Sequence, residues 1–82
     1  MIPPPKKLAD STVKAYAAYR DAEIYHLPTD VQARFFERAQ ALFARLVKAM
    51  RCDPNESWMV SSNIAHMVHN TPPSKKPPTL RG

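Results

Sequence analysis

The chain has 82 residues, one cysteine and a net charge of +5. A chain this short holds one domain and buries only roughly 60% of the surface that its unfolded form exposes, so its own stability is marginal. The single cysteine excludes an intrachain disulfide, and no run of about 18 apolar residues is present to span a membrane. We therefore expect an intracellular protein that gains stability from a partner and has no transmembrane segment.

The positive charge is concentrated near the two ends of the chain. All seven acidic residues lie between Asp10 and Asn70, together with seven of the twelve basic residues, so this central segment is neutral. The high isoelectric point is thus a property of the ends rather than of a basic globular surface. The excess comes from five side chains that we predict to make basic contacts: Lys6, Lys7, Lys75, Lys76 and Arg81.

Residues 1–9 are predicted to form an extended, basic arm, because three consecutive prolines favour the polyproline II conformation. A first helix is predicted over residues 10–26, where Asp10 or the serine after it can cap the first turn and a Leu-Pro step ends the last one. Its apolar face is moderate, and Arg20 and Asp21 lie close to that face.

A long amphipathic helix is predicted over residues 30–52. Thr29 and Gln32 have the spacing of a capping box, whose side chains bond the first free backbone amides. The apolar arc spans about 140°, which is wide enough for two neighbouring elements. An ordinary three-helix core is one interpretation, and a partner interface is the other. The residues that we predict for the interface are Phe35, Phe36, Phe43, Leu46, Met50 and Trp58.

Basic side chains follow one edge of this apolar face over an arc of about 80°. One interpretation is a stripe that contacts phosphate groups. The other is a solvated helix face with local ion pairs, which the neutrality of the central segment favours. The side chains are Arg34, Arg38, Arg45 and Lys48, and the three arginines join the predicted set of basic contacts.

A third helix is predicted over residues 54–69, with Asp53 as its cap and proline at its first position. Asn70 is a candidate left-handed terminator. Residues 71–82 contain four prolines and three positive charges, which cannot form a core and indicate an extended tail. The sequence therefore predicts an all-α, three-helix domain over residues 10–70 between two proline- and lysine-rich tails.

The sequence contains few candidates for chemistry. His66 and His69 lie one helical turn apart and could bind a metal together with Cys52, but no fourth ligand is evident. Nothing resembles a nucleophile elbow or an oxyanion loop, because the only glycine is Gly82. We predict no enzymatic activity, no cofactor and no metal site.

Three short patterns carry a resemblance to a known family. They are Leu27-Pro28, Arg38-Ala39-x-x-Leu42 and Pro54-x-Glu56-x-Trp58, and together they cover less than half of the chain. The patterns resemble the small helical matrix-side subunit of mitochondrial ubiquinol–cytochrome c reductase, the ubiquinol-binding-protein family. This resemblance implies a non-catalytic subunit on the matrix side of the inner mitochondrial membrane, with other protein subunits as partners.

The leading hypothesis is a non-catalytic accessory subunit of a larger assembly, such as a respiratory complex. Its long helix would contact other subunits, and its tails would lie along neighbouring subunits or anionic lipid headgroups. A second hypothesis is a small dimeric helical regulator that binds nucleic acid through the arginines and the tails, with an affinity that falls steeply with salt. A third is a protein inhibitor of a larger enzyme, which would fold alone as a monomer.

Overall fold

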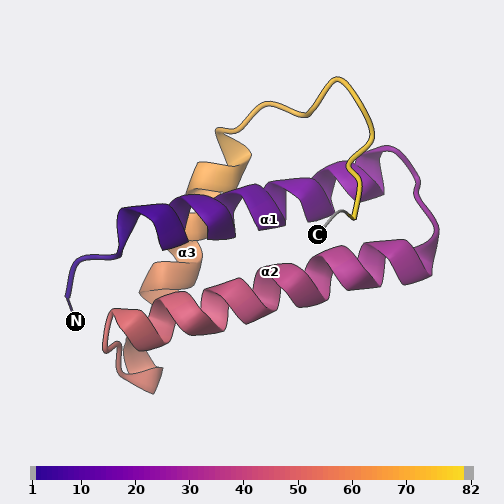
Figure 1. The fold of residues 1–82 in the computed structure, drawn as a ribbon. Coiled ribbons are helices and arrows are strands. Elements are labelled where there is room, and N and C mark those ends of the chain that lie inside the picture. Colours follow the sequence, from indigo (N-terminus) through magenta and orange to yellow (C-terminus); the bar gives the residue numbers. More distant parts are fainter. Residues whose placement is uncertain (1, 81–82) are drawn as a thin grey trace.

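The computed structural model describes residues 2–80, which form three α-helices and no strand (Figure 1). The helices are α1 (Lys6–Ile24), α2 (Thr29–Ala49) and α3 (Ser57–His69), and a 3-10 turn, η1 (Pro54–Glu56), leads directly into α3. The predicted all-α, three-helix architecture is confirmed. Within residues 2–80, no helix combines the length and the apolar character needed to cross a membrane.

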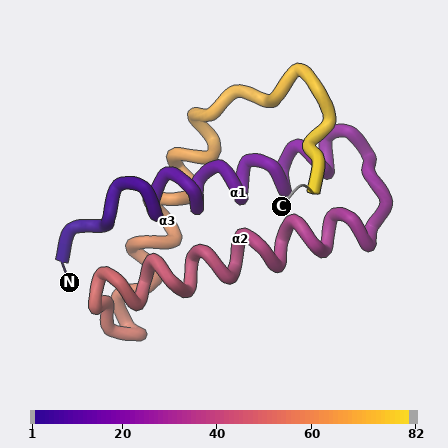
Figure 2. Tube along the Cα trace, viewed as in Figure 1, coloured from indigo at the N-terminus to yellow at the C-terminus, as the bar shows by residue number. Residues whose placement is uncertain are grey.

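The helix α1 lies between the other elements of the fold. It forms an antiparallel hairpin with α2, and α3 crosses it near the open end of that hairpin (Figure 1). The segment after α3 then turns back along α1, as Figure 2 shows from the path of the yellow end of the chain. The helices α2 and α3 meet mainly at their short connection, so the space beyond that connection is bounded by all three helices.

The first helix begins four residues earlier than the sequence predicts. Pro5 precedes its first turn, and the Pro5 carbonyl accepts a hydrogen bond from the Ala9 N–H over 2.9 Å. Because Leu8 and Ala9 pack against the core, an extra helical turn buries apolar surface that an extended arm would leave in water. The predicted arm over residues 1–9 is therefore wrong from Lys6 onward.

The core lies where the end of α2 meets the start of α3. Leu46 from α2 and Met50, which directly follows α2, pack there with Val60 and Ile64 from α3, and all four are buried. The buried residues of α1 are small or polar by contrast, and they face several directions because helical residues step by about 100°. They are Thr12, Ala15, Ala17, Asp21 and Ala22.

The first two helices end with the same backbone motif. His26 (φ 55°) and Arg51 (φ 52°) take left-handed conformations just after α1 and α2. After α1, the Leu27 N–H donates to the Ala22 carbonyl over 3.0 Å, and an equivalent bond of 3.2 Å closes α2. These are Schellman motifs, in which glycine usually takes the left-handed position. Asn70, predicted to be left-handed, instead has φ −81° after α3.

The predicted N-terminal caps of the second and third helices are also wrong in detail. Thr29 is already the first residue of α2, and the capping position before it is occupied by Pro28. Proline has no side-chain acceptor, so this helix start has no side-chain cap. The Gln32 amide reaches back past the helix and donates to the Leu27 carbonyl over 2.8 Å. Asp53 does precede η1, but its side chain makes no capping hydrogen bond.

Candidate functional site

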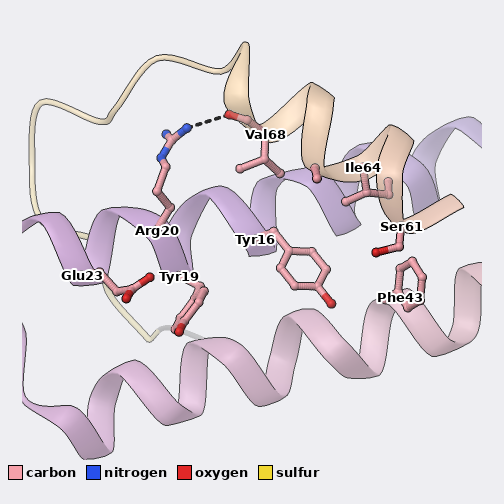
Figure 3. Close-up of a pocket in the computed structure, with 9 residues that line it drawn as sticks. Tyr16, Tyr19, Arg20, Glu23, Phe43, Ser61, Ile64 and Val68 are labelled. Carbon is pink, nitrogen blue, oxygen red and sulfur yellow. Dashed lines mark hydrogen bonds between the residues drawn. The ribbon is translucent and has the colours of Figure 1, made fainter. Parts of the chain in front are cut away.

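A cleft of about 290 Å³ opens to the surface where the three helices diverge. The floor comes from α1, and α2 and α3 supply the walls (Figure 3). We call it the aromatic cleft. Its lining includes Tyr16, Tyr19 and Glu23 from α1, Phe43 from α2, and Ser61 and Ile64 from α3.

Two aromatic pairs join α1 to α2 along this cleft. Tyr16 and Phe43 meet edge to face, with ring centroids 6.5 Å apart and planes inclined by 79°. Tyr19 and Phe36 lie closer, with centroids 5.0 Å apart and planes inclined by 50°. Because α1 and α2 run antiparallel, the later tyrosine meets the earlier phenylalanine. Aromatic pairs of this kind each contribute about 0.5–1.5 kcal/mol beyond area burial, so they hold this side of the cleft in place.

The cleft also carries polar groups with free hydrogen-bonding capacity. Within residues 2–80, the hydroxyls of Tyr16, Tyr19 and Ser61 have no protein partner. They remain in contact with solvent, because no buried side-chain oxygen or nitrogen in that range lacks a partner. Partial burial raises the pKa of Tyr16 above its usual 10.0, so its hydroxyl stays protonated near neutral pH and can donate.

Arg20 closes one end of the cleft and makes four hydrogen bonds there. One of its terminal nitrogens, Nη1, donates to the Val68 carbonyl over 2.6 Å and to the Thr71 carbonyl over 2.7 Å (Figure 3). Its Nε and Nη2 donate to Asp21 Oδ1 over 3.2 and 3.0 Å. Arg20 thus ties α1 to the end of α3, where backbone carbonyls lack helical partners.

Asp21 extends this connection to the segment that follows α3. The residue is only 5% exposed, and its Oδ2 accepts a hydrogen bond from the Ser74 N–H over 3.2 Å. The Tyr25 hydroxyl donates to the Ser74 carbonyl over 2.6 Å. Residues 71–80, which we call the C-terminal strap, therefore lie against α1 within the same chain. Lys75 and Lys76 are exposed on the strap, and Arg81 lies outside the described residues.

The residues predicted for a partner interface divide into two groups. Phe35 and Leu46 are each 1% exposed and Met50 is 6% exposed, so all three belong to the core of this chain. On α2, the middle of the wide apolar arc is covered by α1 and α3. One flank of that arc stays open to solvent. Phe43 on that flank lines the cleft, and Phe36 is 38% exposed beside it. Trp58, at the start of α3, is 67% exposed.

The basic stripe lies on the other flank of α2. Its side chains are exposed, and helical spacing places them away from Phe36 and Phe43. Lys6 and Lys7 are exposed in the first turn of α1, so they are not part of an extended arm. The stripe itself consists of Arg34, Arg38, Arg45 and Lys48.

No cluster of three or more His, Cys, Asp and Glu side chains within residues 2–80 is arranged to hold a metal ion. His66 instead shares a 3.2 Å hydrogen bond with Asn70, and the Cys52 thiol donates to the Asp53 carbonyl over 3.4 Å. The aromatic cleft offers apolar surface, three hydroxyls and the exposed carboxylate of Glu23. This set of groups is suited to binding a ligand in a fixed orientation.

Sequence reasoning did not identify the α1 side of this cleft. Tyr16 and Tyr19 are three residues apart and so share a helix face, but which face meets α2 depends on the packing of the whole chain. The signal for the Arg20–Asp21 connection was present, because two charged residues adjoin an apolar face. Such residues are rarely buried without a partner.

No protein-family model matches this chain, and neither a curated protein nor a solved structure matches it. The patterns that resemble the ubiquinol-binding-protein family have structural roles in this fold. Leu27 and Pro28 form the turn between α1 and α2, and Pro54 opens η1. The resemblance stays a prediction.

Proposed function

We propose that this chain is a non-catalytic protein-binding module that serves as an accessory part of a larger assembly and contacts its partner through the aromatic cleft. The observation that carries this proposal is the solvent-open cleft, together with two exposed aromatic side chains on the helices that form its walls, Phe36 on α2 and Trp58 on α3. Large exposed apolar surfaces with a polar rim are typical of interaction sites.

The two exposed aromatic residues extend the cleft rather than lie apart from it. Phe36 contacts Tyr19, which is part of the lining. Trp58 precedes Ser61 by three residues and Ala65 by seven on α3, so helical spacing puts it on the same helix face as these two lining residues. Tryptophan and tyrosine are the residues most enriched among those that dominate binding energy at protein interfaces. Membership of a respiratory complex rests on the sequence resemblance alone.

Site-specific photo-crosslinking in the source cells tests the proposal. A crosslinking residue placed at Ser61 in the cleft should yield one discrete adduct with another protein. The same residue at Arg45, on the opposite flank of α2, should not yield that adduct. The double variant Phe36→Ser, Trp58→Ser should abolish the adduct from position 61 without unfolding the chain, since neither side chain is buried. Equal adducts from positions 61 and 45, or an adduct that survives the double substitution, would refute the cleft as the docking surface.

A further inference from the structure

We infer that the occupant of the aromatic cleft is a proline-rich segment of the partner, in the polyproline II conformation, with a Lys or Arg beside the prolines. The inference rests on the proposed function, because it takes the cleft to be the protein-binding surface. It adds the chemistry of the segment that binds there. Three features of the cleft and one of the C-terminal strap support it.

The first feature is the arrangement of the aromatic rings. Two rings from α1 and two from α2 are paired across the helix junction, Tyr16 with Phe43 and Tyr19 with Phe36. Aromatic-lined grooves are the sites at which proline-rich segments dock, because the proline rings pack against the aromatic surfaces. The polyproline II conformation is largely preformed in such segments, which lowers the entropy lost on binding.

The second feature is the kind of hydrogen-bonding group in the cleft. Its walls are helices whose backbone groups are already paired, so the free donors are the hydroxyls of Tyr16, Tyr19 and Ser61. A polyproline II segment leaves all of its carbonyls free to accept from them. A helical partner uses its carbonyls internally, and it would bury these hydroxyls without partners at a cost. The donor set therefore favours an extended, carbonyl-presenting segment over a helix.

The third feature is charge. The Arg20 guanidinium is neutralised by Asp21 at 3.0 Å and holds two carbonyls, so it is already engaged. Glu23 is exposed on the cleft lining and forms no salt bridge within residues 2–80. The remaining charge of the cleft is thus negative. A Lys or Arg next to the prolines complements it and fixes the direction in which the segment lies.

The C-terminal strap shows that the chain already holds the backbone of a proline- and lysine-rich segment through side-chain hydrogen bonds. The strap is rich in proline and lysine, and residues on and just after α1 hold its backbone. The Tyr25 hydroxyl donates to the Ser74 carbonyl over 2.6 Å, and Arg20 donates to the Thr71 carbonyl over 2.7 Å. The carboxylate of Asp21 lies beside them. One tyrosine hydroxyl just after α1 and one carboxylate on α1 therefore already bind the backbone of one segment of this composition, and the cleft presents the same kinds of group to another.

The test is a titration of the full chain, labelled with nitrogen-15, with the synthetic peptide acetyl-APPLPPKR-amide. We expect NMR shifts at the amides of Tyr19, Ser61 and Ala65, and a change in the fluorescence of Trp58, the only tryptophan. A peptide in which glycine replaces every proline should bind far more weakly, because it loses the preformed conformation and the proline rings.

Two conservative variants test the named groups. Tyr19→Phe removes one hydroxyl, and Glu23→Gln removes the charge, so each should weaken the proline peptide roughly fivefold or more. The matched control is Tyr25→Phe, which removes the hydroxyl that bonds the strap just after α1 and should leave the peptide affinity unchanged. Circular dichroism of each variant confirms that the helices remain folded.

Several outcomes would overturn the inference, and they differ in what they say of the proposed function. The inference fails if the proline peptide causes no cleft shifts at about 1 mM, the weak end of specific binding. It also fails if the glycine peptide binds equally well. If an amphipathic helical peptide shifts the cleft amides and the proline peptide does not, the cleft is still the docking surface but its occupant is a helix. Cleft shifts that depend on the concentration of the chain without peptide would identify a second copy as the occupant.

Discussion

The first two helices are packed in opposite ways, although they form one hairpin. α2 buries large side chains such as Phe35 and Leu46 along one line and exposes its flanks. α1 buries small and polar side chains, including Thr12 and Ala22, on more than one side. Its neighbours are α2, α3 and the C-terminal strap. The helix with the stronger amphipathic pattern therefore lies at the edge of the fold, and the weaker one lies in the middle.

This difference teaches how to interpret a weak apolar stripe. A single stripe is typical of a helix with one neighbouring surface, whereas a helix with neighbours on several sides has no single apolar face. Small side chains on α1 let several backbones approach closely, so Ala15, Ala17 and Ala22 matter for their size rather than their hydrophobicity. The open flank of α2, in turn, is what leaves surface for the aromatic cleft.

The largest expected effect comes from breaking the buried line of α2. Phe35 is 1% exposed and its neighbour Phe36 is 38% exposed. Phe35→Ala should lower the free energy of unfolding by about 3–5 kcal/mol, because it removes apolar contacts and leaves a cavity. Phe36→Ala should cost about 1 kcal/mol, chiefly through its pair with Tyr19. Urea denaturation measures both, and equal losses would contradict the one-sided burial of α2.

A second prediction concerns the polar side of α1. Asp21→Asn removes the ion pair with Arg20, so the unfolding free energy should fall by about 1.5–3 kcal/mol, as expected for hydrogen bonds to a charged group. Amide hydrogen exchange at Ser74 should accelerate, since its acceptor is Asp21 Oδ2. The control Asp30→Asn changes an exposed carboxylate in the first turn of α2 and should leave Ser74 exchange as it is. Slow exchange at Ser74 in Asp21→Asn would show that the strap is held by other contacts.

A third prediction tests whether α1 is enclosed on more than one side. Ala17 (6% exposed) and Ala22 (0% exposed) point in directions about 140° apart. Replacing either one with leucine should cost about 1–3 kcal/mol through overpacking. Ala33, an exposed alanine of α2, should accept leucine with little change. If Ala17→Leu costs as little as the control at Ala33, the strap covers its side of α1 only loosely. The helix is then closely packed on one side only.

The sequence predicts the helices well because their signals are local. Pro28 and Pro54 separate three helical patterns, and the buried positions of α2 recur at helical spacing. The central position of α1 is a property of tertiary packing, which determines that Thr12 and Asp21 are buried. The candidate site was predicted only in part, because one of its sides depends on local pattern and the other on tertiary packing. Phe36 and Phe43 belong to the visible arc of α2, whereas their tyrosine partners depend on how α1 is rotated against it.

The smallest expected effect concerns the ends of the two helices, where α1 and α2 are alike. His26 and Arg51 take the left-handed conformation, which costs a residue with a Cβ atom roughly 1–2 kcal/mol. Glycine avoids that strain but loses more chain entropy on folding, so His26→Gly and Arg51→Gly should each raise stability by about 0.5–1 kcal/mol.

The controls His26→Ala and Arg51→Ala keep the Cβ atom and should bring no gain. Thermal unfolding of the four variants separates conformational strain from loss of the side chain. A gain at both glycine variants and at neither alanine variant means that the two helices end under the same backbone strain, however differently their faces pack. If only one glycine variant gains stability, contacts of the native side chain at the other position offset the backbone strain there. The ends of α1 and α2 would then differ, as their packed faces do.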